Sequence, residues 1–241
     1  MKFETYSRTF LHFHTEEVPE LLIKYLPKGT FSLVDLGAGD GTLLMALQHG
    51  GYLSRTSNVS AVDLSAERCE KLRQCADFHV FCSDVTDTPD LTSDSFDCVI
   101  CTQVIEHVDQ EKLLTEINRI LRTDGILYLA SLVKKWYGWW YYRTVNGKWA
   151  IDPTHLREYA SMADFEKVIK EAGFEIIETK LNPLKLSVLE FIVRRIIVPL
   201  FHPQNINDFF LKYRSANWLR NSINVRPPGY YIVESINKKV K

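Results

Sequence analysis

The feature that most constrains the fold of this chain is a glycine-rich turn directly after a short apolar run. Residues 33–36 read Leu-Val-Asp-Leu, and Gly37, Gly39 and Gly41 follow within five positions. Branched and apolar residues favour a buried strand, whereas glycines let the backbone turn tightly and approach a ligand closely. A helical pattern begins at Thr42. A strand, a glycine turn and a helix in this order predict one unit of a parallel α/β sheet.

Two acidic residues, Asp35 and Asp40, decide which ligand suits this turn. A dinucleotide-binding fingerprint has its third glycine one position later, where this chain has Thr42. Two carboxylates would also repel a pyrophosphate. They favour a ligand without phosphate and with a positive end, such as S-adenosylmethionine, which carries an ammonium and a sulfonium. The alternative is a plain tight turn, in which Asp40 caps the following helix.

Short apolar runs alternate with helical patterns through the first two thirds of the chain. The further runs are 58–63, 78–82, 96–101 and 126–133, and the helical patterns are 66–76 and 110–122, with Ser65 as a cap. This alternation predicts a doubly wound, mostly parallel sheet with helices on both faces. A later helix at 161–173 and strands at 174–179 and 230–235 extend the pattern, with 230–235 antiparallel at the edge of the sheet.

Polar side chains lie at or beside the carboxyl ends of four predicted strands: Asp35, Asp63, Asp84 and Gln103. Ligands of parallel sheets bind beyond these ends. Asp63 comes 22 positions after Gly41, about where a strand-end carboxylate meets a ribose diol. We therefore expect the four side chains to converge on one ligand site.

The ordered segments LVDLGAGDG, AVDLS, CSDV, FDCVICTQVIEHV and LRTDGILYLA carry a family resemblance. Together they resemble class I S-adenosylmethionine-dependent methyltransferases, in the group that includes ubiquinone-biosynthesis and small-molecule O-methyltransferases. The resemblance covers about residues 30–180. It implies a Rossmann-like sheet of seven strands and S-adenosylmethionine as the cofactor.

The resemblance also implies a set of cofactor-binding residues: Asp35, Gly37, Ala38, Gly39, Gly41, Asp63, Leu64, Asp84, Val85 and Gln103. By this likeness Asp35 and the glycine turn hold the methionine part, and Asp63 binds both ribose hydroxyls. Asp84 binds the adenine amino group while Leu64 and Val85 flank the ring. Gln103 stands near the methionine end.

A hydroxyl acceptor must lose its proton, and histidine is suited to this near neutral pH. The candidate catalytic residues are His107, after the fourth strand, and His155, in a segment similar to one that borders the substrate pocket in small-molecule relatives. The alternative for each is a structural or surface histidine. Glu106, His107 and His155 also suggest a metal site, but Gln103 stands where a further carboxylate is expected in metal-binding relatives. We therefore expect no metal, because hard cations prefer charged oxygens.

We divide the chain into four parts: an N-terminal helical segment (1–30), the cofactor-binding core (31–180), a basic and apolar cap (181–227), and the last strand with its tail (228–241). The aromatic stretch within 134–160 has two interpretations, a substrate wall or lid, and a satellite core or oligomer contact. Residues 186–201 predict a helix with a wide apolar face that Pro199 ends. Such a helix suits a lid, a membrane contact or a dimer seam.

Charge is distributed unevenly along the chain. The net charge is −7 over residues 1–100 and +7 over residues 181–241. A basic tail can bind nucleic acid, acidic lipid or an acidic substrate, or dock against the acidic half. Cys98 and Cys101 form a C-x-x-C spacing inside a predicted strand, where residues three apart face opposite ways. We therefore expect no metal or redox role for this pair, and a reducing cytoplasm as the compartment.

These observations predict a methyltransferase that methylates oxygen on a small-molecule or lipid-linked acceptor. The alternatives are an RNA methyltransferase that uses the basic tail, and a cofactor-binding protein without turnover. We expect a cytoplasmic protein and no nucleic-acid partner, with peripheral membrane contact through residues 185–201 as an alternative to internal packing or a lid. The acceptor and the oligomeric state stay open.

Overall fold

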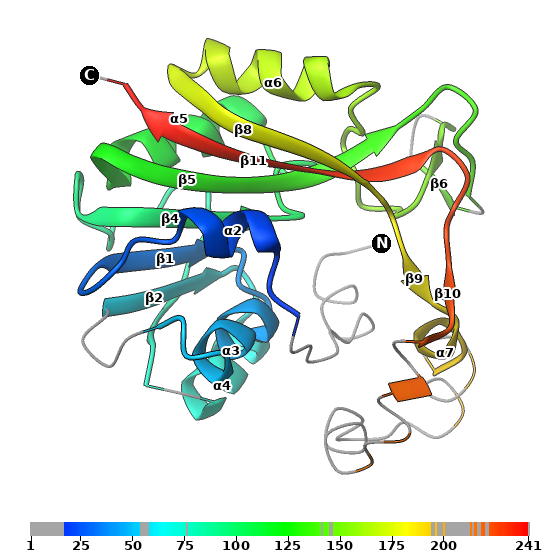
Figure 1. The fold of residues 1–241 in the computed structure, drawn as a ribbon, viewed down its shortest axis with the longest axis horizontal. Coiled ribbons are helices and arrows are strands. Elements are labelled where there is room, and N and C mark those ends of the chain that lie inside the picture. The colour runs from blue at the N-terminus through cyan, green and yellow to red at the C-terminus, as the bar shows by residue number, and fades with distance from the viewer. Residues whose placement is uncertain are drawn as a thin grey trace.

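The computed structural model describes residues 17–53, 58–75, 77–140, 142–144, 147–193, 196, 200, 213, 215, 218–219 and 222–240. In this part of the chain a seven-stranded sheet has the order β3-β2-β1-β4-β5-β11-β8 (Figure 1). Its strands are β1 (Ser32–Leu36), β2 (Asn58–Asp63), β3 (His79–Cys82), β4 (Phe96–Thr102), β5 (Leu121–Lys134), β8 (Phe174–Pro183) and β11 (Tyr230–Lys239). The predicted doubly wound, mostly parallel sheet is confirmed.

The last strand, β11, lies inside the sheet. It pairs antiparallel with β5 on one side and with β8 on the other, so that Val233 faces Ser131 and Leu181. The predicted antiparallel direction is confirmed, but the predicted edge position is wrong, because β8 occupies the edge. Val233 and Ile236 of β11 are fully buried, as expected for a strand with a neighbour on each side.

Helices cover both faces of the sheet. They are α2 (Glu20–Tyr25), α3 (Thr42–His49), α4 (Ala66–Cys75), α5 (Gln110–Ile120) and α6 (Met162–Glu171). Side chains of α5 and α6 pack in one apolar cluster, and those of α2, α3 and α4 pack in another. Asp109 caps α5 by accepting hydrogen bonds from the backbone of Glu111 and Lys112. The strand after α5 begins at Leu121, five residues earlier than predicted.

The two clusters lie on opposite faces, as Cys98 and Cys101 of β4 demonstrate. Cys98 belongs to the cluster under α2 and α3, and Cys101 to the cluster under α5 and α6. Burial raises the pKa of both thiols well above its usual value. The expectation that these cysteines face opposite ways is therefore confirmed.

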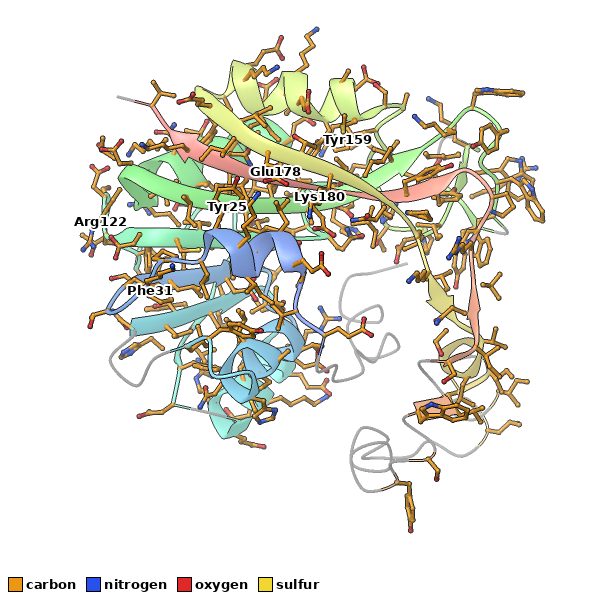
Figure 2. The ribbon with its side chains drawn as sticks, in the orientation of Figure 1. Tyr25, Phe31, Arg122, Tyr159, Glu178 and Lys180 are labelled. Atoms are coloured by element: carbon orange, nitrogen blue, oxygen red, sulfur yellow. The ribbon has the colours of Figure 1, made fainter. Side chains whose placement is uncertain are left out.

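The short helix α2 connects to the edge strand through polar contacts. The Lys24 ammonium and the Tyr25 hydroxyl both donate to Glu178 Oε2 of β8, over 2.6 and 2.9 Å. Figure 2 shows Tyr25 and Glu178 close together across this face of the sheet. This helix lies in the predicted N-terminal segment (1–30). Residues 1–16 of that segment lie outside the described residues.

Two small ribbons extend from the carboxyl-end side of β5 and β8 (Figure 1). One pairs β6 (Tyr142–Arg143) with β7 (Trp149–Ala150), and the other pairs β9 (Leu186–Ser187) with β10 (Asn224–Val225). The helix predicted from residue 186 begins later, as α7 (Val188–Ile192), because Leu186 and Ser187 pair with β10. Pro199 lies outside the described residues. Among the helices described, none is long and apolar enough to span a membrane. The four-part division of the chain stays a prediction.

Candidate functional site

The glycine turn joins β1 to α3 in a backbone conformation that favours glycine. Gly37, Gly39 and Gly41 have φ angles of 79°, 61° and 86°. The backbone N–H groups of Gly37 and Ala38 donate to Val62 O of β2, over 2.8 and 2.9 Å. A Cβ atom on Gly37 would lie 2.3 Å from a methyl group of Val104, so no larger residue fits there. The turn is thus held against the end of β2.

Asp63 at the end of β2 completes this arrangement. Its Oδ2 accepts from Gly39 N over 3.0 Å, and its Oδ1 accepts from Ser65 N over 2.8 Å. Ser65 Oγ in turn accepts from Arg68 N over 3.4 Å, which confirms the predicted cap of α4. The Asp63 side chain is 5% exposed. A buried carboxylate is therefore fixed beside the glycine turn.

Asp35 is the second buried carboxylate at this place. It is 2% exposed, and its Oδ1 has no hydrogen-bond partner among the described residues. Burial, followed by the charge of Asp63, raises the pKa of Asp35 to about 7. A positively charged ligand would stabilise the ionised form of Asp35. The two carboxylates Asp35 and Asp63 therefore suit a cation.

The remaining predicted cofactor residues follow the carboxyl ends of β2, β3 and β4. Asp84 is exposed, and its Oδ1 accepts from the backbone and the hydroxyl of Thr86 over 2.9 and 2.8 Å. Leu64 is 51% exposed, and Val85 is buried. Gln103 is exposed and has a φ angle of 56°. Their roles in binding a cofactor stay predictions.

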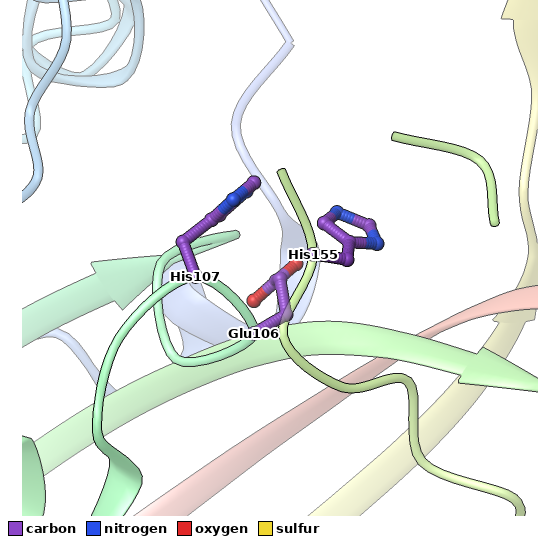
Figure 3. Close-up of side chains that lie close together, drawn as sticks. All are labelled: Glu106, His107 and His155. Atoms are coloured by element: carbon purple, nitrogen blue, oxygen red, sulfur yellow. The ribbon is translucent and has the colours of Figure 1, made fainter. Parts of the chain in front are cut away.

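Glu106, His107 and His155 come together at the carboxyl ends of β4 and β5 (Figure 3). The two imidazole ring centroids lie 4.7 Å apart. The segment that carries His155 is tied to the loop after β4, since Leu156 N donates to Glu106 O over 2.8 Å. The predicted pair of histidines is therefore brought to one place by two separate segments.

His107 is held as a neutral imidazole. The Thr154 hydroxyl donates to Asp152 Oδ1 over 2.6 Å, so it accepts from His107 Nδ1 over 2.9 Å. Burial and the neighbouring His155 lower the pKa of His107 to about 4. His107 is accordingly uncharged at neutral pH.

His155 is oriented by a carboxylate that the sequence analysis did not single out. Its Nδ1 lies 3.0 Å from Glu158 Oε1, which also accepts from Ile151 N over 3.0 Å. Lys134 Nζ lies 3.6 Å from Glu158 Oε2. Burial opposes the charged imidazolium, but the bond to Glu158 and the charge of Glu106 raise the pKa of His155 above its usual value. The His-x-x-Glu spacing is the signal that could have found Glu158.

Glu106 is fully buried beside the two histidines. Its Oε2 accepts from Ser131 Oγ over 3.0 Å, and its Oε1 has no partner among the described residues. Burial raises the pKa of this carboxyl to about 7. Glu106 therefore adds a group that can share a proton with its neighbours.

The same three side chains are the group that could hold a metal among the described residues. Their ligand atoms lie within 4.8 Å of one another. Ligands that share one ion at about 2.1 Å lie about 3.0–3.5 Å apart, so the three would have to close in on an ion. That the cluster works without a metal stays a prediction.

Arg68, on the first turn of α4, is another residue that the sequence analysis missed. Its side chain is 10% exposed, and Nη1 lies 3.9 Å from Asp63 Oδ2. A charged residue four positions before the fully buried Leu72, on the same helix face, was the available signal.

The aromatic stretch after β5 divides into a packed and an exposed part. Trp140 packs against a satellite cluster formed by Leu132, Leu184 and Tyr230. Trp136 and Trp139 are 94% and 57% exposed. Within the described part of this stretch, the satellite-core interpretation is therefore confirmed for Trp140 and not for Trp136 or Trp139.

Comparison with known proteins identifies a family for the first part of the sheet. Residues 34–129 match a family model described as "Methyltransferase domain". An uncharacterised protein of Methanocaldococcus jannaschii is 28% identical over 136 residues, which are 55% of this chain and 56% of that protein. A ubiquinone biosynthesis O-methyltransferase of Neisseria meningitidis is 22% identical over 159 residues, which are 61% of this chain and 65% of that protein. The matched segments thus span between half and two thirds of these relatives.

A solved structure of a putative methyltransferase from Bacillus halodurans shares the fold, with a TM-score of 0.62 and 18% identity. The likeness covers 92% of this chain and 98% of that one. Its agreement with the strand order described above, together with the match over residues 34–129, identifies the core. The chain carries a class I S-adenosylmethionine-dependent methyltransferase domain.

Proposed function

We propose that this protein transfers a methyl group from S-adenosylmethionine to an oxygen atom of a small-molecule or lipid-linked acceptor. The observation that carries this proposal is the orientation of His155 by Glu158. This histidine lies on the carboxyl-end side of the sheet, as do Asp35 of β1 and Asp63 of β2. A histidine oriented by a carboxylate is a suitable general base for a hydroxyl group. The Neisseria relative is named as an O-methyltransferase, which supports an oxygen acceptor.

The residues present fit the cofactor. The unpartnered Asp35 Oδ1 and the glycine turn would hold its cationic methionine part, and Asp63 would hold its ribose hydroxyls. Leu64 and Val85 would flank the adenine ring, whose amino group Asp84 would bind. When bound, S-adenosylmethionine supplies a methyl group that its sulfonium already activates.

In this mechanism His155 accepts the proton of the acceptor hydroxyl at Nε2, because Nδ1 is bound to Glu158. Loss of this proton would leave the acceptor oxygen as the nucleophile for the activated methyl group. Glu158 and Glu106 then stabilise the imidazolium that forms. The neutral His107 accepts a hydrogen bond from the acceptor and helps to align it.

The test compares His155→Ala with His49→Ala, a matched change in the last turn of α3. Radiolabelled S-adenosylmethionine is added to an extract of the source organism, and the label is counted in lipid, polar small-molecule and RNA fractions. We expect His155→Ala to lower methyl transfer about 100-fold or more. Binding of S-adenosylhomocysteine by calorimetry should change less than threefold.

Other outcomes would favour the alternatives. Unchanged turnover would remove His155 from the mechanism. Cofactor binding by the unaltered protein without label in any fraction would favour a protein without turnover. Label in RNA, with binding that weakens steeply as salt rises, would favour the RNA methyltransferase.

A lipid-linked acceptor is favoured by the exposed apolar side chains of residues 185–201. Ile192, Ile196 and Leu200 are 39%, 51% and 67% exposed, and the exposed, basic Lys185 begins the same segment. Together they support a peripheral contact between a cytoplasmic protein and an anionic membrane. Co-sedimentation with phosphatidylserine vesicles, but not with pure phosphatidylcholine vesicles, is the expected result. Equal amounts of protein sedimenting with both kinds of vesicle would contradict an electrostatic contact with the membrane.

A further inference from the structure

Arg68 is a buried cation placed between the candidate cofactor site and the candidate base. It lies on the first turn of α4, three residues after the Ser65 cap. Its side chain is 10% exposed, and the ion pair from Nη1 to Asp63 Oδ2 measures 3.9 Å, too long for a hydrogen bond. Asp63 thus balances the charge of Arg68 without occupying its donors.

One donor nitrogen of Arg68 lacks a partner. Nη2 is buried and donates to no hydrogen-bond acceptor among the described residues. A buried donor that makes no hydrogen bond is unfavourable, and more so when it is charged. The guanidinium group can therefore donate a hydrogen bond to an acceptor atom that the described part of the chain does not provide.

The charge of Arg68 also acts on His107. After burial and His155, the positive charge of Arg68 is among the influences that lower the pKa of His107. The guanidinium therefore lies within electrostatic reach of both Asp63 and His107. These two residues mark the cofactor side and the acceptor side of the candidate site.

We propose that Arg68 binds an anionic group, a carboxylate or a phosphate, carried by the methyl acceptor. The planar guanidinium matches such groups with paired hydrogen bonds. The acceptor is the better source of this anion, because the cofactor's own carboxylate belongs to its methionine part, which the glycine turn would hold, whereas Arg68 lies beside Asp63. The inference rests on the proposed methyl transfer and adds a substrate class to it: acceptors with a negative charge near the reacting hydroxyl.

The experiment measures binding rather than turnover, so that it stands apart from the test of methyl transfer. The probes are 4-hydroxybenzoate, phenyl phosphate and the uncharged phenol, titrated into protein saturated with S-adenosylhomocysteine. We expect at least one charged probe to bind ten times more tightly than phenol. His155→Ala should keep this preference even though it abolishes turnover.

Two variants assign the preference to Arg68. Arg68→Met should reduce the preference to less than twofold, and Arg68→Lys should retain part of it. Arg73→Met, on the exposed side of the same helix, is the matched control and should leave it unchanged. The melting temperature of each variant is measured alongside, because loss of Arg68 leaves the buried Asp63 without its counter-charge.

Three results would overturn the proposal. Equal binding of the three probes, or no binding of the charged ones, would show that the site does not select an anion. A loss of more than tenfold in S-adenosylhomocysteine affinity in Arg68→Met would place Arg68 on the cofactor. A marked fall in melting temperature with unchanged probe binding would make Arg68 a structural partner of Asp63.

Discussion

The backbone N–H of Gly39 donates to Asp63 Oδ2 over 3.0 Å, so the turn after β1 and the end of β2 form one rigid unit. The same carboxylate accepts from Ser65 N, at the start of α4. Three consecutive elements thus meet at one side chain. A change at Asp63 should therefore affect ligand binding and turn geometry together.

Asp63→Ala should weaken binding of S-adenosylhomocysteine by about 10- to 100-fold, because charge-assisted hydrogen bonds contribute about 1.5–3 kcal/mol. Isothermal titration calorimetry measures the change. Asp90→Ala, an exposed acidic residue before β4, is the control and should bind normally. Unaltered affinity in Asp63→Ala would show that the ribose assignment is wrong.

Affinity for S-adenosylmethionine should rise with pH through about 7. The pKa of Asp35 is raised to about 7 by burial and by Asp63, so the carboxyl is mostly protonated at pH 6 and ionised at pH 8. Only the ionised form attracts a cationic ligand, and we expect about tenfold tighter binding at pH 8 than at pH 6. Asp35→Asn should bind weakly, with this dependence removed. If Asp35→Asn kept the full pH dependence of binding, another titrating group would be responsible for that dependence.

Glu158→Gln should reduce kcat and shift its acidic limb to lower pH. Glu158 raises the pKa of His155 against the effect of burial, so its neutralisation makes the imidazolium easier to deprotonate. The base then becomes active at lower pH but is weaker and less well oriented. The pH profile of kcat separates this from a structural role, which would lower kcat without moving the limb. Glu171→Gln, at the exposed end of α6, should leave the profile unchanged.

Glu116→Gln should lower the free energy of unfolding at pH 7 by about 1–3 kcal/mol. Arg119 donates to both carboxylate oxygens of Glu116 over 2.9 and 2.7 Å, and Thr88 donates to one of them through its backbone over 2.9 Å. The bonds from Arg119, opposed by burial and aided by Thr88, lower the pKa of Glu116 to about 2.

The sign of this pKa shift fixes the pH range of the effect. A lowered pKa stabilises the fold above the unfolded value near 4.5, and this stability is lost as the pH falls toward 2. The free energies of unfolding of the two proteins, measured with urea, should therefore differ most at pH 7 and converge as the pH approaches 2. A difference that stays constant between these pH values would point to packing instead of charge.

The local parts of the site could be predicted from the sequence. Gly37 and Asp63 sit in patterns of a few residues, and the strand and turn geometry that they require is set by neighbours in the chain. The opposite orientation of Cys98 and Cys101 follows in the same way from the period of a strand.

The contacts that orient the candidate base could not be predicted so directly. Glu158 binds His155 because residues 151–159 fold back over the end of β5 and are tied to Glu106, which lies about 50 positions earlier. The burial of Arg68 likewise depends on how α4 packs on the sheet. Such features arise from tertiary packing, which no short sequence pattern contains.

The position of β11 has a consequence for how the protein is made. β5 and β8 are both synthesised before β11, yet neither has its final neighbour until β11 is inserted between them. A nascent chain that stops short of residue 230 therefore exposes two unpaired strand edges, which are prone to pair with other chains. The sheet is therefore completed only after β11 has left the ribosome. The end of β5 that carries Ser131 takes its final position at the same time.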